Sequence, residues 1–232
     1  MGTPPGQVGS GAPAGGGRGR KPLVHRGVEL RCTTRFEDEA RAQGCQTVGG
    51  ADEVGRGALC GPVVACAVVL GDGFDTTGID DSKRLTALQR EALAGRVRER
   101  ARAWGMGVSD APEIDRYNIL QATLIAIRRA VEALACGADL VLIDALDVPG
   151  LKVAQRAIVK GDALSVSIAA ASIVAKVARD DMMRELDRRY PGYGLAHNMG
   201  YASDDHREAL RRLGPSEIHR RSFRGTQRWL FC

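Results

Sequence analysis

Residues 49–70, GGADEVGRGALCGPVVACAVVL, are the stretch on which the fold prediction rests. Two carboxylates, Asp52 and Glu53, close a short apolar run, and a Gly-Arg-Gly turn follows at 55–57. The small and β-branched residues of 58–70 are typical of a buried strand. The stretch therefore predicts a strand, a tight loop and a second strand, with paired acids at the mouth of the loop.

Helical and strand patterns interleave along the rest of the chain, which predicts an α/β fold. Thr86 and Gln89 form a capping-box signature at the start of one helix, and Gly137 and Pro191 are stop signals for two others. Outside 49–70, the predicted elements are helices over 29–43, 86–102, 118–135, 167–190 and 203–214, and strands over 104–109, 139–144 and 153–159.

The bulk composition places limits on the class of protein. The 232 residues carry a formal net charge of +5, a mild bias towards polyanionic partners. Residues 1–28 are dominated by Gly, Pro and Ala and are predicted to form a disordered leader, with one domain over 29–232. No signal peptide or membrane span is visible and the six cysteines lack metal-site spacing, so we expect a cytoplasmic protein with reduced thiols and no zinc site. No heptad or large apolar stripe is visible, which favours a monomer.

Four acids follow predicted strands or loops: Asp52, Glu53, Asp144 and Asp162. A cluster of carboxylates with few histidines is an oxygen-ligand site that suits Mg²⁺ or Mn²⁺. Two such ions about 3.5–4 Å apart would support in-line displacement at a phosphodiester. The alternative is that each acid is a cap or turn residue. Asp52 and Glu53 also share a site only if the backbone bends between them, because neighbouring strand residues point to opposite faces.

The Gly-Arg-Gly turn at 55–57 has two interpretations. It is either a simple hairpin connection or a clamp of backbone amides and an arginine on sugar and phosphate. It is neither a P-loop nor a dinucleotide fingerprint, because no Gly-Lys-Ser/Thr ends it and strand sequence follows. No nucleophile triad is apparent either. His206 and His219 are interpreted most simply as surface or structural residues, with contact to substrate as the alternative.

Further motifs follow one another along the chain: DDSKRLT, YNILQATLIAI, LIDA, VKGDALSVSIAAASIVAKVARD, YPGYG, GYASDDH and GPSEIHRRSF. With the 49–70 stretch, they resemble the bacterial type 2 ribonucleases H, the ribonuclease HII family, from about residue 35 to 223. The resemblance implies an RNase H-like α/β fold, a central mixed sheet flanked by helices. It also implies a helical, basic C-terminal region over about 184–232 that covers the substrate.

The resemblance assigns roles to particular residues. The metal-binding and catalytic carboxylates would be Asp52, Glu53, Asp144 and Asp162. The Gly-Arg-Gly loop would read the 2′-hydroxyl that distinguishes RNA from DNA. Lys83 would contact a backbone phosphate, and Tyr201 would stack on a sugar at the RNA–DNA junction. The implied substrate-binding residues are Gly55, Arg56, Gly57, Ser82, Lys83, Arg179 and Tyr201.

The implied reaction is hydrolysis of the RNA strand of RNA–DNA hybrids and cleavage 5′ of single ribonucleotides in duplex DNA. Two divalent ions, Mg²⁺ or Mn²⁺, would act, and 3′-hydroxyl and 5′-phosphate ends would result. Two alternatives stay open: a module that binds hybrids without cutting them, and a DNA-specific nuclease with a similar carboxylate site. The related ribonuclease HIII is disfavoured, because only the leader precedes the expected domain.

The family's usual HKGY reads Asn198-Met199-Gly200-Tyr201 here, so one lysine is replaced by methionine, and salt dependence of binding should be slightly shallower. The segment Gln227–Phe231, QRWLF, resembles the peptides that bacterial replication proteins insert into the sliding clamp. The alternative is that this apolar end packs on its own domain.

Overall fold

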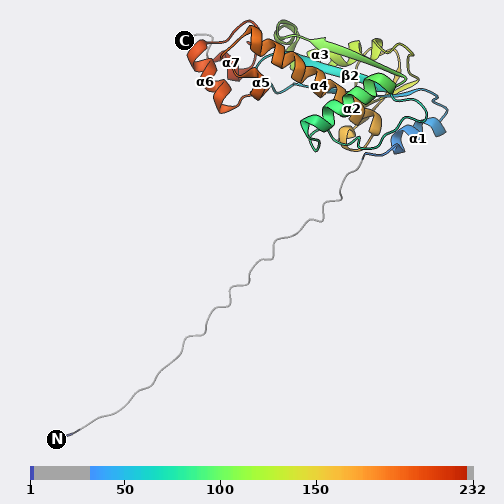
Figure 1. Cartoon of the computed structure of the whole chain (residues 1–232), viewed down its shortest axis with the longest axis horizontal. Helices are drawn as coiled ribbons and strands as arrows, with labels where there is room; N and C mark the ends of the chain where they lie inside the picture. Colours follow the sequence, from blue (N-terminus) through green and yellow to red (C-terminus); the bar gives the residue numbers. More distant parts are fainter. Residues whose placement is uncertain (3–31, 229–232) are drawn as a thin grey trace.

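The computed structural model describes residues 1–2 and 32–228 (Figure 1). Its centre is a five-stranded sheet in the order β3-β2-β1-β4-β5. The pairs β1–β2 and β2–β3 are antiparallel, whereas β1–β4 and β4–β5 are parallel, so the predicted mixed sheet is confirmed. The strands are β1 (Val48–Val54), β2 (Val63–Val69), β3 (Ala103–Ser109), β4 (Leu140–Asp144) and β5 (Ala154–Ile158).

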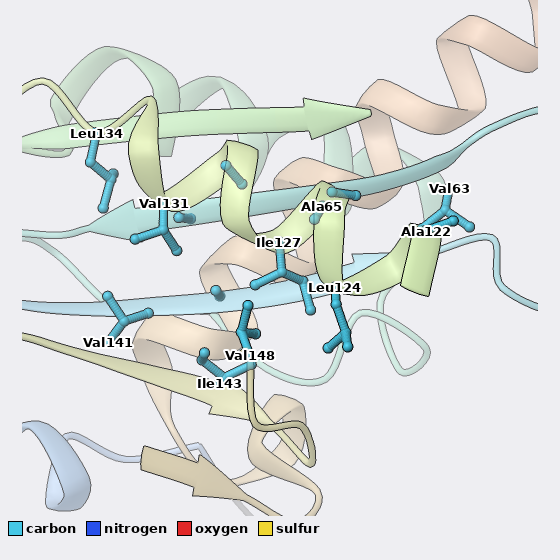
Figure 2. Close-up of a cluster of buried hydrophobic side chains, with 14 of the residues drawn as sticks. Val63, Ala65, Ala122, Leu124, Ile127, Val131, Leu134, Val141, Ile143 and Val148 are labelled. Carbon is cyan, nitrogen blue, oxygen red and sulfur yellow. The ribbon is translucent and has the colours of Figure 1, made fainter. Parts of the chain in front are cut away.

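Helices cover both faces of the sheet. Helix α3 (Ala111–Glu132) lies across one face, and α4 (Val166–Arg189) crosses the other, with α2 (Ala87–Arg100) packed on α4. Figure 2 shows α3 pointing Leu124, Ile127 and Val131 at the strands beneath it. The smaller helices are α1 (Arg35–Ala42), η1 (Gly161–Ala163), α5 (Leu195–Asn198), α6 (Asp204–Leu213) and α7 (Arg224–Gln227).

Strand β2 serves both layers of the core because its side chains alternate. Ala65 and Ala67 pack with α3, while Cys66 and Val68 pack with α4. All seven residues of the strand are buried, as the uninterrupted small and β-branched run predicts. The neighbouring strand β1 follows the same alternation, with Ala51 in the layer under α3.

Helix α4 approaches strand β1 unusually closely at Gly50. A Cβ atom placed on Gly50 would lie 2.2 Å from the carbonyl carbon of Ser167 and 2.4 Å from the backbone nitrogen of Ile168. The first half of α4 consists almost entirely of small apolar residues, so its backbone can lie directly on the sheet. This approach fixes where the N-terminal half of α4 lies relative to the end of β1.

The far end of α4 extends past the sheet into a separate group of helices. Figure 1 shows α5, α6 and α7 gathered at that end of the molecule. They form a cluster of buried residues that includes Leu59 and Cys60 from the β1–β2 loop, Met183 from α4 and Leu210 from α6. The predicted helical C-terminal region is therefore present over the described residues, and it packs against the β1–β2 loop.

Helix boundaries differ from the predictions in two places. The predicted helix over 118–135 is the second half of α3, which begins at Ala111 and is broken at Asn118, where φ is 67°. Asp110 caps the unpredicted first half by accepting from the amide of Glu113, and Asn118 caps the second half by accepting from Leu120 and Gln121. Only the start of the second half was predicted from the sequence.

The predicted helix over 29–43 is shorter than expected. It is α1, which begins at Arg35, because Thr33 is engaged in a parallel β-bridge with Ser165. Residues 29–31 of the predicted helix lie outside the described part of the chain. The short helices η1, α5 and α7 were not predicted, since one turn of helix leaves no periodic pattern in a sequence. By contrast, the capping box of Thr86 and Gln89 is present at the start of α2, and α4 ends at Arg189, before Pro191.

The predicted leader over 1–28 falls, apart from Met1 and Gly2, outside the described residues, so both the leader and the single domain over 29–232 stay predictions. In the described part of the chain, no helix combines the length and apolar character needed to cross a membrane. The cysteines in that part are all free thiols: Cys32, Cys45, Cys60, Cys66 and Cys136.

Substitution of Gly50 by alanine tests the close approach of α4 to β1. The added methyl group would overlap backbone atoms, so we expect Gly50→Ala to lower the free energy of unfolding by about 3 kcal/mol or more. Gly95→Ala in α2 is the matched control, because a Cβ there meets nothing within 4 Å. That variant should gain roughly 0.5–1 kcal/mol. Urea unfolding measures both, and a loss below about 1 kcal/mol for Gly50→Ala would contradict the packing argument.

Candidate functional site

Three separate chain segments bring the four predicted acids into one pocket of about 300 Å³. Asp52 and Glu53 lie near the end of β1, Asp144 is the last residue of β4, and Asp162 lies in η1. The parallel register pairs Ala51 with Ile143, which sets the next residues of the two strands, Asp52 and Asp144, side by side. We call these four residues the carboxylate site.

The backbone between Asp52 and Glu53 does not bend in the way that the sequence analysis required. Strand β1 keeps its pairing with β2 without interruption through Val54, and the positive φ of 93° comes only at Gly55. Both acids nevertheless line the same pocket. The partner strand β4 ends at Asp144, so the last residues of β1 project past it and side chains from both faces reach the opening. A bend was therefore not required for Asp52 and Glu53 to share a site, and that condition was wrong.

The turn that carries Asp162 is fixed to the end of β4. The backbone amide of Gly161 donates to Oδ1 of Asp144 at 2.7 Å. Lys160 before it has a left-handed conformation, with φ of 59°. A Cβ on Gly161 would lie 2.5 Å from the Cδ1 atom of Ile168, so the turn lies directly on α4. Asp162 follows at once and is held over the ends of β1 and β4.

The negative charge of the carboxylate site is only partly balanced by nearby cations. Arg56 lies 3.2 Å from Glu53, and the Lys83 ammonium lies 2.6 Å from Asp162. Within residues 32–228, Asp52 and Asp144 form no ion pair. Burial, followed by the charge of Glu53, raises the pKa of Asp52 well above its usual range. Burial also raises the pKa values of Glu53 and Asp144.

These side chains fit divalent cations such as Mg²⁺ or Mn²⁺. All four potential ligands are carboxylates, the donors that such ions prefer. Oε2 of Glu53 is buried and has no hydrogen-bond partner within the described chain. An orphaned buried oxygen and two unpaired acids with raised pKa values are groups that a bound cation would stabilise. The carboxylate site therefore has both the donor chemistry and the excess charge of a metal site.

The other predicted residues lie around this pocket. Arg56 and Gly57 are exposed, and Tyr201, with 39% of its surface exposed, lines the pocket beside them. Ser82 is buried and lies 3.1 Å, oxygen to oxygen, from Ser172. Lys83 reaches the pocket through its bond to Asp162.

Arg179 is the exception among the predicted substrate contacts. It is completely buried, and its guanidinium donates to the backbone carbonyls of Pro62, Met199 and Cys60. The ring of Tyr201 lies 5.5 Å from its Cζ atom. Arg179 therefore supports the loop and Tyr201 from beneath and does not present donors to the pocket.

Three polar residues that line the same pocket were not predicted from the sequence: Ser172, Lys176 and Arg90. A hydrogen bond from Ser172 partly offsets the rise in the pKa of Asp52. Lys176 pairs with Asp180 at 2.6 Å, one turn further along α4. The spacing of Ser172, Lys176 and Asp180 at i, i+4 and i+8 was the available signal, because it places all three on one face of a helix.

Cys60, His206 and His219 form a buried cluster that the sequence analysis did not anticipate. Their potential ligand atoms all lie within 4.8 Å of one another, although the residues are far apart in the sequence. Both imidazoles are fully buried, so of the two interpretations, surface or structural, only the structural one stands for them. Cysteine spacing, on which the expectation of no zinc site was based, does not reveal a cluster whose members meet only in the folded chain. Hydrogen bonds occupy the ring nitrogens of both histidines.

Solved structures with the same fold define the class of this protein. The ribonuclease H2 of Pyrococcus horikoshii OT3 superimposes with a TM-score of 0.66 at 29% identity, over 79% of this chain and 96% of that one. The ribonuclease HII in a PCNA:RNase HII complex from Archaeoglobus fulgidus gives 0.66 at 25% identity, over 77% and 95%. The predicted RNase H-like fold is thus confirmed, and the fold is that of the type 2 ribonucleases H.

Sequence comparison then gives the family. The family described as Ribonuclease HII matches residues 49–226. Curated proteins named Ribonuclease HII include one from Geobacter sulfurreducens, 52% identical over 84% of this chain and 90% of that protein. Another, from Moorella thermoacetica, is 51% identical over 82% of this chain and 92% of that protein. The chain belongs to the ribonuclease HII family and is an enzyme of the metal-dependent nuclease class.

Replacement of Asp52 by asparagine should change the pH dependence of stability. Because the pKa of Asp52 is raised on folding, the folded protein keeps a proton that the unfolded chain releases above about pH 4. Wild-type stability should therefore fall as the pH rises from about 4 towards the raised pKa. Asp52→Asn should lack this contribution and melt at a higher temperature at pH 7 in EDTA.

Calorimetry from pH 4 to 8 measures this difference, and added Mg²⁺ provides a second readout. Mg²⁺ should raise the melting temperature of the wild type more than that of Asp52→Asn, because the variant lacks one carboxylate ligand. Parallel melting curves of the two proteins at every pH would show that Asp52 is not destabilised by its neighbours.

Proposed function

We propose that this protein is an endoribonuclease that hydrolyses the RNA strand of RNA–DNA hybrids and cuts 5′ of single ribonucleotides embedded in duplex DNA. The products would carry 3′-hydroxyl and 5′-phosphate ends. The observation that carries the proposal is a carboxylate site with unbalanced charge, next to the exposed Arg56 and Gly57 of the Gly-Arg-Gly loop. Family membership supports the same reaction class.

We infer that Asp52, Glu53, Asp144 and Asp162 hold two divalent ions, Mg²⁺ or Mn²⁺. Such ions supply activation of the attacking water and stabilisation of the leaving 3′ oxygen. The protein's own contribution is to hold these acids in fixed positions. Asp144 is oriented by the Gly161 amide, and Asp52 is oriented by the amide of Glu53 at 2.8 Å.

The Gly-Arg-Gly loop is the proposed reader of the 2′-hydroxyl. Arg56 and Gly57 are exposed at the edge of the pocket, and their backbone amides are donors that a hydroxyl oxygen can accept from. A Cβ on Gly57 would lie 3.9 Å from Cε1 of Tyr201, so a sugar held by the loop would also meet this ring. Tyr201 would stack on the sugar that follows the ribonucleotide.

Lys83 is the proposed phosphate contact. Its side chain is 78% exposed, and its ammonium bonds to Asp162 at the mouth of the pocket. It can therefore reach a phosphate at the same opening without disturbing the core. Ser82 supports this segment through its buried contact with Ser172. Met199, where the family usually has lysine, is half-buried against the C-terminal cluster. If that lysine contacts phosphate in the family, this chain lacks the contact.

Electrostatics favours the enzyme over the two alternatives. A module that only bound hybrids would gain nothing from Asp52 and Asp144, which form no ion pair within residues 32–228 and repel phosphate when no cation is bound. A DNA-specific nuclease would have no use for exposed loop amides at the sugar edge. Incubation of the enzyme with an all-DNA duplex and with the same duplex bearing one ribonucleotide separates these functions.

Cleavage mapping on a duplex with one ribonucleotide tests the proposal directly. We expect a single Mg²⁺- or Mn²⁺-dependent cut 5′ of the ribonucleotide. Asp52→Asn should bind the duplex yet cut it at least about 100–1000-fold more slowly, because loss of one group that stabilises transition-state charge costs roughly 3–4 kcal/mol. Asp181→Asn, an exposed acid on α4, is the control and should cut normally. Near-normal cutting by Asp52→Asn would refute the assignment.

We also propose that Gln227–Phe231 binds a sliding clamp. Residues 229–232 lie outside the described part of the chain, so support comes from the motif and from the archaeal ribonuclease HII that forms a complex with PCNA. Deletion of 227–232 should lower affinity for the clamp at least about 10-fold, as loss of an apolar anchor does. Cutting of a short duplex should stay the same.

Surface plasmon resonance on immobilised clamp measures this affinity. Leu213→Ala removes an exposed apolar side chain from α6 and serves as the control, with no expected change. Equal clamp affinity before and after the deletion would remove the proposal. The cytoplasmic location and the monomeric state stay predictions from the sequence.

A further inference from the structure

The loop between β1 and β2, residues 55–62, is held from below by a buried arginine. Arg220, in the segment between α6 and α7, is completely buried. Its Nε and Nη2 atoms donate to the carbonyl of Gly61 at 3.0 and 2.9 Å, and Nη2 also donates to Gly55 at 2.8 Å. Nη1 donates to Arg56 at 2.8 Å and to Ala58 at 2.7 Å. All five guanidinium donors are thus used, and every acceptor belongs to this one loop.

Arg220 keeps its charge without a carboxylate partner. Over the described residues, its guanidinium forms no ion pair, and burial lowers its pKa to about 9. A buried charge is costly unless hydrogen bonds compensate for its lost hydration. Here the loop carbonyls provide that compensation, so guanidinium and loop conformation depend on each other.

The hydrogen bonds to Arg220 determine where the loop amides point. In a trans peptide unit the C=O and N–H groups point in opposite directions, and the described chain has no cis peptide bond. The carbonyls of Gly55 and Arg56 point to Arg220, so the amides of Arg56 and Gly57 point away from it. Both residues are exposed, and neither amide has a hydrogen-bond partner within residues 32–228. Two consecutive donors therefore face outward beside the carboxylate site, an arrangement that suits an oxygen ligand.

The backbone around Arg220 is anchored independently of its side chain. The amide of Arg220 donates to the carbonyl of Leu59 at 2.9 Å, and the amide of Gly61 donates to Ile218 at 3.0 Å. Cys60 and His219 form an antiparallel bridge between these bonds. A side-chain substitution at 220 thus removes the guanidinium contacts and leaves the backbone pairing in place.

The same segment also fixes Tyr201. Nδ1 of His219 accepts from the amide of Ser216, so its proton lies on Nε2, which donates to Nε2 of His206 at 3.1 Å. His206 in turn donates from Nδ1 to the carbonyl of Tyr201 at 2.8 Å. Arg179 links the loop to the segment that carries Tyr201, because it donates to Cys60 in the loop and to Met199, two residues before Tyr201.

We propose that Arg220 is a positioning residue that orients the amides of Arg56 and Gly57 towards the substrate and so sets the preference for a 2′-hydroxyl. This role rests on the ribonucleotide recognition proposed above. Arg220 acts through the loop and does not touch the nucleic acid itself. The neighbouring His219–His206 pair holds Tyr201 in a fixed position relative to those amides.

Arg220→Lys is the test variant, because it keeps the charge but offers three donors in place of five. Arg221→Lys, at an exposed neighbouring position, is the control. Trypsin cutting of the native full-length enzyme after Arg56 should rise roughly 10-fold in Arg220→Lys, and kcat/KM on a single-ribonucleotide duplex should fall roughly 10- to 100-fold, as small misplacements of positioned groups do. The control should match the wild type in both measurements.

A binding ratio separates positioning from a general structural role. The ratio of Kd values for an all-DNA duplex and a single-ribonucleotide duplex, measured in Ca²⁺, should fall towards one in Arg220→Lys. The Mg²⁺-induced shift in melting temperature should match the wild type, because the carboxylate site is unchanged. Unaltered trypsin cutting and an unaltered Kd ratio in the folded variant would overturn the proposal.

If Arg220→Lys does not fold, relaxation measurements on the wild type test whether the loop amides are held rigidly. Backbone order parameters of Arg56 and Gly57 should then be close to about 0.85, the value of rigid backbone, although both amides are exposed. Values below about 0.6 would show a mobile loop and overturn the proposal. If the wild type does not cut a ribonucleotide-bearing duplex, the proposed function fails. Relaxation and trypsin cutting would still test whether Arg220 fixes the conformation of the loop.

Discussion

The contact between helix α4 and strand β1 at Gly50 is closer than any side chain would allow, and the candidate site depends on it. The backbone of Ser167 and Ile168 occupies the space of the missing Cβ. This contact brings Ser172 and Lys176, further along α4, over the end of β1 and next to Asp52. It also places the turn before α4, which carries Asp162, over the end of β4. Four acids from three segments therefore meet because one helix lies directly on the sheet.

Most of the fold could be predicted from periodicity and end signals. The capping box at Thr86 and the stop at Pro191 each correspond to a helix end near the expected position. The apolar run over 58–70 does contain the buried strand β2, but this strand begins only at Val63, because the preceding residues form the β1–β2 loop. The kink at Asn118 could not be predicted in the same way. A polar residue within a helical pattern can cap a second helix or simply face solvent, and only the left-handed backbone conformation distinguishes the two.

The candidate site was predictable to a different extent in each of its parts. Acids that follow buried strands are a strong signal, and all four line one pocket. Their roles, and those of the loop residues, stay proposals. The sequence could not reveal that Arg179 lies beneath the loop or that Arg220 holds it, because an arginine beside other charged residues gives no sign of burial. The cluster of Cys60, His206 and His219 was hidden for a related reason, since its members meet only through the tertiary fold.

The long separation between the loop and Arg220 has a consequence for biosynthesis. Contacts between Gly61 and Arg220 span 159 residues, so they form only after the ribosome has nearly completed the described chain. Strands β1, β2 and β4 and the turn with Asp162 are translated much earlier. A nascent chain can thus assemble its acidic pocket before the loop beside it acquires a fixed shape. The order of translation therefore allows the carboxylate site to form first, whereas the loop can be fixed by Arg220 only afterwards.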